Sequence, residues 1–176
     1  MIFHPTNLQD ARLIELKYIS DDRGFFARSY CAQEFAANGL HAVFVQQNSS
    51  QSLKKGTIRG LHYQKAPYAE VKVMRCLRGA IFNVIVDLRP ESPTYKRWQG
   101  FELTADNRHQ LYVPEGFANG YQALVDGAEV AYLVSSAYAP GAEGGVRYND
   151  PALGIDWPHE VTIVSHKDQN WQDFVD

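Results

Sequence analysis

Residues 71–88 read VKVMRCLRGAIFNVIVDL, which is two strand-like apolar runs separated by Arg78-Gly79. A two-residue break that contains glycine, placed between two such runs, predicts a β-hairpin. We therefore expect strands over 71–77 and 80–88 that pair with each other. Regular β structure in the middle of the chain is the first indication of the fold class.

The rest of the chain repeats this pattern of short strand-like runs with glycine or proline between them. One helix is expected over Cys31–Asn38, where apolar residues follow helical spacing and Gly39 provides a stop. Because crossover helices are missing, a parallel α/β fold is disfavoured, and an all-β sandwich or barrel is predicted as one domain over 1–176. Further strands are expected over 13–18, 42–47, 57–63, 98–103, 110–113, 121–124 and 129–134.

The composition is that of an ordinary globular protein, with 45% hydrophobic and 21% charged residues among 176. A formal net charge of -3 argues against general nucleic-acid binding, although a local basic pocket for a small anion is compatible with it. No apolar run approaches the ~20 residues that span a bilayer, so no membrane partner is expected. Cys31 and Cys76 are far apart and no signal peptide is visible, so we expect a reducing, cytoplasmic location.

Several common catalytic signatures are missing from the sequence. The chain has no phosphate-binding G-x-x-x-x-G-K-[ST], no G-x-G-x-x-G opening a helix, no G-x-S-x-G and no H-E-x-x-H. The six histidines are scattered and do not form the His-x-His pattern of a metal-binding cupin. We therefore expect no metal site.

The densest polar segments are Gln46-Gln47-Asn48-Ser49-Ser50 and Arg59-Gly60-Leu61-His62-Tyr63-Gln64. Strict strand alternation would place Arg59 and His62 on opposite faces of a strand. A bulge at Gly60 is the alternative, and it would re-aim the residues that follow. Arginine and amide side chains around a histidine favour ligand recognition over simple packing.

These segments belong to a longer series of motifs that runs in order along nearly the whole chain. The series consists of Asp22-Arg23-Gly24-Phe25-Phe26, Gln46-x-Asn48-x-Ser50-x-Ser52, Arg59-Gly60-Leu61-His62-Tyr63-Gln64, Lys72-Val73-Met74-Arg75, Val86-Asp87-Leu88-Arg89, Pro114-Glu115-Gly116-Phe117-Ala118, Tyr132, Tyr138, Glu143, Asn149-Asp150-Pro151, Ile155-Asp156-Trp157-Pro158 and Ser165-His166-Lys167-Asp168. Taken together, these motifs closely resemble the dTDP-4-dehydrorhamnose 3,5-epimerase family. Each motif alone is weak, and the ordered set is specific.

The resemblance implies a cupin-like β jelly roll with short helices, assembled as a homodimer that exchanges N-terminal strands. It also implies epimerisation of a dTDP-linked 4-keto-6-deoxyhexose at C3 and C5, with neither a metal nor an organic cofactor. The chemistry agrees, because both protons flank the C4 ketone and their removal leaves an enolate. Such a site needs a base, a proton donor on the other face and positive charge near the ketone oxygen.

The resemblance also assigns roles to individual residues. His62 matches the base and Asp168 the carboxylate that orients it. Tyr132 matches the acid on the opposite face, and Lys72 matches a cation near the keto oxygen. The matching substrate contacts are Arg23 and Arg59 for the diphosphate, Tyr138 for stacking on thymine, and Gln46, Asn48, Glu143 and Lys167 for further polar groups.

Three positions depart from the family pattern. Arg28 stands where glutamate is usual, Asn83 where aspartate is usual, and Asn119 where histidine is usual. We keep Arg28 and Asn119 as expected substrate contacts. The departures leave four alternatives open: a C3 or C5 mono-epimerase, a 3,4-ketoisomerase, a non-catalytic sugar-nucleotide binding protein and a metal cupin. Without the resemblance, Tyr132 and Tyr138 would be interpreted as packing residues, and Asp168 as a turn cap.

Overall fold

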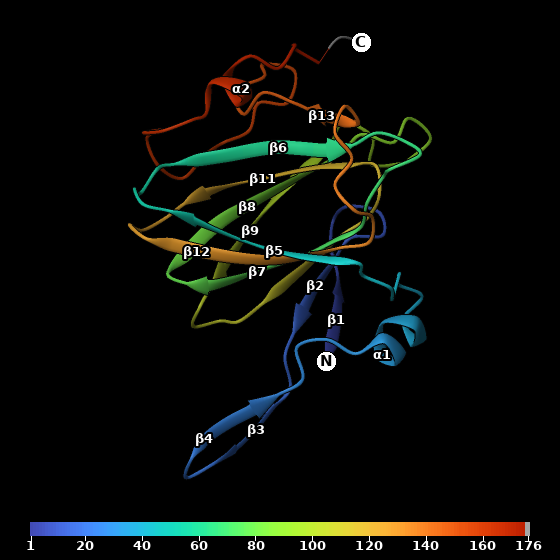
Figure 1. Cartoon of the computed structure of the whole chain (residues 1–176), viewed down its shortest axis with the longest axis vertical. Coiled ribbons are helices and arrows are strands. Elements are labelled where there is room, and N and C mark those ends of the chain that lie inside the picture. Colours follow the sequence, from blue (N-terminus) through green and yellow to red (C-terminus); the bar gives the residue numbers. More distant parts are fainter. Residues whose placement is uncertain (175–176) are drawn as a thin grey trace.

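The structure, a computed structural model, describes residues 1–174 and consists mainly of two facing antiparallel β-sheets (Figure 1). It confirms the predicted all-β fold with short helices. The six-stranded sheet contains, in spatial order, β1 (Ile2–Pro5), β2 (Arg12–Glu15), β10 (Gln110–Val113), β7 (Lys72–Arg78), β12 (Ala128–Val134) and β5 (Gln46–Ser52). The five-stranded sheet contains β13 (Glu143–Gly145), β6 (Ile58–Gln64), β11 (Phe117–Ala123), β8 (Ala80–Asp87) and β9 (Trp98–Thr104).

The hairpin predicted for residues 71–88 is wrong, although both of its strands exist. β7 pairs with β10 and β12 in one sheet, whereas β8 pairs with β11 and β9 in the other. The turn at Arg78-Gly79 therefore carries the chain from one sheet to the other. Gly79 has a φ of +72°, and a Cβ there would approach Val125 Cγ2 to 2.6 Å, so glycine suits this tight corner.

The five-stranded sheet packs against an apolar layer on each of its two faces. Between the sheets, Met74 of β7 and Leu111 of β10 pack with Ile81 and Ile85 of β8 in one buried cluster. On the outer face, the segment after β13 covers the sheet, and its apolar side chains pack on Leu61, Val84, Val86 and Ala118. This C-terminal segment places α2 (His166–Gln169) over β6, as Figure 1 shows.

The strand expected over 42–47 is wrong, because residues 41–45 form no regular strand and β5 begins at Gln46. Val43 and Val45 are exposed, so their alternating apolar pattern does not mark a buried face. β5 instead consists of the polar residues QQNSSQS and pairs with β12 along its whole length. Polar residues can form this edge strand because several of its side chains line a cavity rather than the core.

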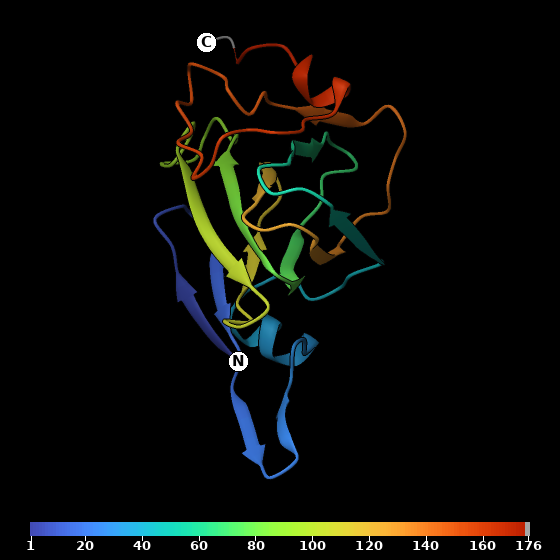
Figure 2. The same ribbon diagram turned by 90° about the vertical axis from the view of Figure 1, so that its left-hand side faces the viewer.

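The N-terminal part extends beyond the sandwich. β3 (Tyr18–Asp21) and β4 (Gly24–Ala27) form a separate two-stranded hairpin that projects away from the body (Figures 1 and 2). The strand predicted over 13–18 is shorter than expected and ends at Glu15. The predicted helix is confirmed as α1 (Ala32–Ala37), flanked by Cys31 and Asn38. Among the described residues, no helix has the length and apolar character needed to cross a bilayer.

Candidate active site

A bulge in β6 brings Arg59 and His62 to the same cavity. On the neighbouring strand β11, Tyr121 pairs with Arg59 and Asn119 pairs with His62. The two partners on β11 are two residues apart, whereas Arg59 and His62 are three residues apart on β6. β6 therefore contains one extra residue at this point, which is a β-bulge. The extra residue reverses the alternation between the two side chains, and both line the cavity. The bulge alternative for Gly60 is therefore confirmed.

Gly60 is the residue at which the bulge bends the strand. Its φ is +101°, in a region that side-chain-bearing residues rarely adopt. A Cβ at this position would lie 2.7 Å from the Asn119 carbonyl oxygen and 2.8 Å from Gly120 Cα. Only a glycine fits this close approach between the two strands, so the sequence Arg59-Gly60 is part of how the site is built.

His62 is held by a buried carboxylate from the C-terminal segment. Its Nε2 lies 2.5 Å from Oδ1 of Asp168, whose side chain is only 5% exposed. The other carboxylate oxygen accepts a hydrogen bond of 3.2 Å from the Gly60 backbone N–H. Because Asp168 engages Nε2, the imidazole has its orientation fixed and Nδ1 is the ring nitrogen left for a bound molecule.

The surroundings of Asp168 favour its ionised form. Burial by itself would raise the pKa of this carboxyl, but hydrogen bonds from His62, Gly60 and Ser165 oppose burial and lower the pKa below its ordinary value. Ser165 precedes α2 and accepts a hydrogen bond of 3.1 Å from the Asp168 N–H, which fixes this short helical turn against β6. The His62–Asp168 pair is therefore a carboxylate–imidazole dyad at the edge of the cavity.

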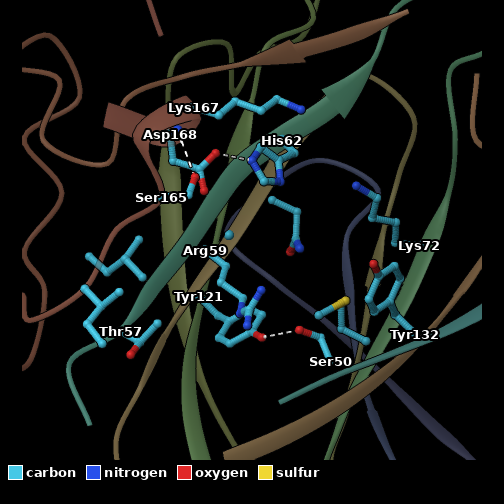
Figure 3. Close-up of a pocket in the computed structure, with 15 residues that line it drawn as sticks. Ser50, Thr57, Arg59, His62, Lys72, Tyr121, Tyr132, Ser165, Lys167 and Asp168 are labelled. Atoms are coloured by element: carbon cyan, nitrogen blue, oxygen red, sulfur yellow. Dashed lines mark hydrogen bonds and ion pairs between the residues drawn. The ribbon is translucent and has the colours of Figure 1, made fainter. Parts of the chain in front are cut away.

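Lys72 and Tyr132 face this dyad from the opposite sheet, as Figure 3 shows. They lie on the adjacent strands β7 and β12, which pair antiparallel. Burial raises the pKa of the Tyr132 phenol, and the nearby Tyr121 and Glu70 raise it further, so the phenol is held in its protonated form. The cavity that these groups share has a volume of about 420 Å³. Its other polar side chains are Ser50, Thr57, Arg59, Asn119, Tyr121, Ser165 and Lys167.

A second hollow of about 290 Å³ shares His62, Lys72 and Tyr132 with the first one. The predicted residues Gln46, Asn48, Tyr138 and Glu143 line it. Gln46 donates a hydrogen bond of 2.8 Å to Asn48, and its carbonyl oxygen accepts from the Tyr138 N–H. Glu143 forms an ion pair of 2.6 Å with Lys167, which connects the rims of the two hollows. The two hollows therefore form one site with the three shared side chains at its centre.

Asn119 lines the first cavity and is held by Asn83 of the neighbouring strand β8. The Asn83 amide donates a hydrogen bond of 2.8 Å to Asn119 Oδ1, and both side chains are buried. The Asn83 carbonyl oxygen has no partner among the described residues. Two of the three positions that depart from the family pattern are thus in contact with each other, which sequence spacing does not reveal.

The structure does not bring Arg23 and Arg28 to the cavity of this chain. Arg23 is at the turn of the β3–β4 hairpin, where its side chain is 89% exposed and pairs with Asp21. Arg28 follows the hairpin and forms an ion pair of 2.8 Å with Glu34 of α1. The β3–β4 hairpin, with Arg23 at its turn, projects away from the sandwich, as Figure 2 shows.

One charged residue in the site was missed by sequence reasoning. Glu70 lines the second hollow and lies 3.0 Å from the Lys72 ammonium. The available sequence signal is an acidic residue two positions before Lys72, which is the first residue of β7. Tyr121, Ser50 and Thr57 were also missed because their types occur often and carry no distinctive spacing. Among residues 1–174, no three His, Cys, Asp or Glu side chains gather as a metal-binding cluster.

The fold and the site define a class: a cupin-like β-sandwich whose internal cavity sets a carboxylate–imidazole dyad opposite a lysine and a tyrosine. The family model described as dTDP-4-dehydrorhamnose 3,5-epimerase matches residues 5–176. The chain belongs to this family.

Relatives of known name and structure agree along nearly the whole length. The dTDP-4-dehydrorhamnose 3,5-epimerase of Shigella flexneri is 44% identical over 97% of this chain and 94% of its own. The crystal structure of the Bacillus anthracis dTDP-4-dehydrorhamnose 3,5-epimerase with TDP and PPi bound has a TM-score of 0.95 and 45% identity, covering 98% of this chain and 99% of that one. A Legionella pneumophila dTDP-6-deoxy-D-glucose-3,5-epimerase in complex with dTDP-4-keto-L-rhamnose has a TM-score of 0.88 and 39% identity, with 95% and 89% covered.

Proposed function

We propose that this protein epimerises a dTDP-linked 4-keto-6-deoxyhexose at C3 and C5, as a step of deoxysugar biosynthesis of the rhamnose type. The observation that carries the proposal is the His62–Asp168 dyad facing Lys72 and Tyr132 across one cavity. Family membership and the ligand named for the Legionella relative support the substrate class. The reaction needs no electron acceptor, because it only moves protons next to a ketone.

The proposed mechanism is a proton abstraction followed by return of a proton from the other face. His62 takes the proton from C3 or C5, and the electron pair of that C–H bond moves through the carbonyl onto the C4 oxygen as an enolate. The Lys72 ammonium stabilises the developing negative charge. The enolate then collapses to the ketone as Tyr132 gives its phenolic proton to the carbon. Solvent afterwards removes the proton from His62 and restores the one on Tyr132.

The remaining residues bind the nucleotide in this proposal. Arg59 stands near the mouth of the first cavity, where its guanidinium donates to Ser52 Oγ and the Gln51 carbonyl. A guanidinium fork held in this way suits a diphosphate. Tyr138 is 56% exposed at the rim of the second hollow, which leaves its ring available to stack on thymine. Gln46, Asn48, Asn119, Glu143 and Lys167 supply further polar contacts.

Proton exchange with solvent tests the proposed reaction. The enzyme would be incubated with dTDP-4-keto-6-deoxyglucose in deuterated water and followed by NMR. We expect deuterium at C3 and C5, together with the epimerised product. Exchange at one carbon only would indicate a mono-epimerase, and movement of the ketone to C3 would indicate a 3,4-ketoisomerase. Binding of the nucleotide without any exchange would leave a non-catalytic sugar-nucleotide binding protein and refute the proposal.

We also propose that the protein acts in the cytoplasm as a homodimer in which the β3–β4 hairpin reaches the second copy. The hairpin leaves Ile19 70% exposed and Phe26 65% exposed, and these two residues pair across its strands. Exposed apolar side chains on a projecting hairpin favour coverage by another surface. Arg23 and Arg28 would then contribute to the partner's cavity, which explains why they do not line their own.

Mixing two impaired variants tests the shared site. His62→Ala removes the base from a chain, and Arg23→Ala removes a contact that we assign to the partner's cavity. In a heterodimer of the two variants, one cavity would combine an intact His62 with an intact Arg23. We expect mixing after partial dissociation to restore activity. No restoration, or a monomer by light scattering, would contradict the shared site.

A further inference from the structure

Glu70 is a largely buried carboxylate in the second hollow, and neither the sequence pattern nor the mechanism above gives it a role. It precedes β7 by two residues and lines the hollow that contains Lys72 and Tyr132. Its side chain is only 10% exposed, and that of Lys72 is 11% exposed. A carboxylate is costly to bury unless it has partners, so the contacts of Glu70 indicate what it does.

Both oxygens of Glu70 have partners that fix its position. Oε1 lies 3.0 Å from the Lys72 ammonium, and Oε2 accepts a hydrogen bond of 3.3 Å from the Gln64 amide. Gln64 is itself buried and immobilised, since its amide also donates to the Tyr68 and Ala137 carbonyls and its carbonyl oxygen accepts from the Ala139 N–H. Glu70 is therefore a rigid anchor for the ammonium rather than a mobile surface charge.

The charge of Glu70 also acts on Tyr132. Burial is the largest cause that raises the pKa of the Tyr132 phenol, and the charges of Tyr121 and Glu70 add to it. A hydrogen bond from Asn48 and the charge of Arg59 lower it in part. A negative carboxylate near the phenol disfavours the phenolate. A phenol that must give up a proton as an acid has to retain it until that moment.

We propose that Glu70 is a positioning residue of the epimerisation: it holds the Lys72 ammonium in the cavity and places a negative charge in the hollow that Tyr132 also lines. This inference rests on the proposed function for Lys72 and Tyr132. Glu70 touches neither the substrate nor the reacting atoms in this role, and acts through the two groups beside it. The lysine would otherwise have to be ordered by the substrate itself, at a cost in rate.

The other ionisable groups around Tyr132 must stay unchanged for a test to report on Glu70. The five-stranded sheet and α2 present Arg59, His62, Tyr63, Tyr121, Lys167 and Asp168 to the two hollows. The rim contributes Tyr138 and Glu143, and a hollow on the other side of Tyr132 is lined by Arg75 of β7 and by Tyr30, which precedes α1. Glu70→Gln keeps the shape of the side chain and all of these groups, and removes one negative charge.

For the active enzyme, we expect Glu70→Gln to lower kcat by about tenfold or more and to leave KM within about twofold, because substrate contacts are intact. The alkaline limb of the kcat–pH profile should move to lower pH, since Tyr132 loses its proton more easily. Glu70→Asp keeps the charge and should retain the native alkaline limb. Glu102→Gln, on the exposed side of β9, is the matched control and should behave as the native protein.

A second measurement does not depend on turnover. The ¹³Cζ signal of Tyr132, assigned with Tyr132→Phe, would be titrated in the substrate-free native protein and in Glu70→Gln. We expect a lower midpoint in the variant. An unchanged midpoint with kcat reduced equally at every pH, or with a native kcat, would overturn the proposal. If the native protein shows no proton exchange, the proposed function fails, while the Tyr132 midpoint still decides whether Glu70 controls this phenol.

Discussion

The cavity and the β3–β4 hairpin each carry an arginine expected to bind diphosphate, yet the two regions are built in different ways. Arg59 lies on β6 of the five-stranded sheet, next to a bulge, and donates hydrogen bonds to two residues of β5. Arg23 sits on a two-stranded hairpin with no sheet beside it, and its partner Asp21 is on the same turn. One arginine is positioned by the protein core and the other by its own turn.

This difference shows that a matched sequence motif identifies a functional residue but not whether that residue serves the cavity of its own chain or that of a partner chain. The cavity is complete in its acid–base groups within one chain, because β6, β7, β12 and α2 converge there. The hairpin is less complete by itself, because Ile19 and Phe26 are largely exposed and Arg23 pairs with Asp21 of its own turn instead of facing the cavity. The following experiments probe this contrast between a self-sufficient cavity and a dependent hairpin.

The largest effect is expected from His62→Ala, which removes the proposed base from the cavity. The rate of deuterium exchange at C3 and C5 should fall by about 10²- to 10⁴-fold, as is usual when a general base is lost. Affinity for dTDP, measured by calorimetry, should remain close to the native value because the nucleotide contacts are retained. A variant that keeps its exchange rate would show that the dyad is not the base.

Asp168→Asn should have the next largest effect, on both rate and pH dependence. Loss of the carboxylate that orients His62 should slow exchange by about 100-fold. The folded protein holds the pKa of Asp168 below its ordinary 3.8, so the ionised carboxylate stabilises the fold above that pH and the stabilisation is lost as pH falls toward the lower folded value. Urea unfolding at neutral and acidic pH should therefore show a weaker loss of stability on acidification in the variant. An identical acid dependence would exclude this linkage.

A comparison of Arg59→Ala with Arg23→Ala tests the contrast directly. Arg59→Ala should weaken dTDP binding by about 10- to 100-fold at every protein concentration, since a charge-assisted hydrogen bond contributes about 1.5–3 kcal/mol. Arg23→Ala should weaken binding only at concentrations where the dimer is present. Arg78→Ala, at an exposed strand end, controls for the loss of a positive charge. If dTDP affinity depended on protein concentration in the same way in both variants, the contrast between the cavity and the hairpin would be refuted.

The smallest effect on the protomer is expected from Ile19→Ser combined with Phe26→Ser in the hairpin. Both side chains are exposed, so the free energy of unfolding of the separated protomer should change by less than about 0.5 kcal/mol per residue. The dimer should nevertheless dissociate at a higher protein concentration than the native dimer, as measured by light scattering. A dimer of native strength would place the interface elsewhere.

The sequence predicted individual strands well and their partners less well. The runs over 71–77 and 80–88 are strands, but a glycine turn between them looks the same whether the strands pair or enter different sheets. β5 escaped detection because its polar residues face a cavity, and the hydrophobic pattern reports only faces that contact the core. The pairing of β7 and β8 and the polar character of β5 are both set by the position of the second sheet, and local strand propensity does not report that position.

Prediction of the site followed a similar division. The resemblance brought His62, Lys72, Tyr132 and Asp168 to attention, and the structure brings all four together. Their contact arises from a bulge and from a short helix more than 100 residues further along the chain, and composition gives no sign of either. Glu70 escaped because a glutamate near a strand end is ordinarily a solvated residue, and only its burial distinguishes it.

The bulge at Gly60 has a consequence for the range of molecules that this site can process. Arg59 and His62 lie on one strand with two residues between them, so the proposed diphosphate contact and the proposed base are kept at a fixed separation by the backbone. A molecule bound by its phosphates at Arg59 would present to His62 the carbons that lie at this fixed distance from the phosphates. The sugar ring can then vary in its substituents, whereas lengthening or shortening the link to the phosphates would move the reacting carbons out of register.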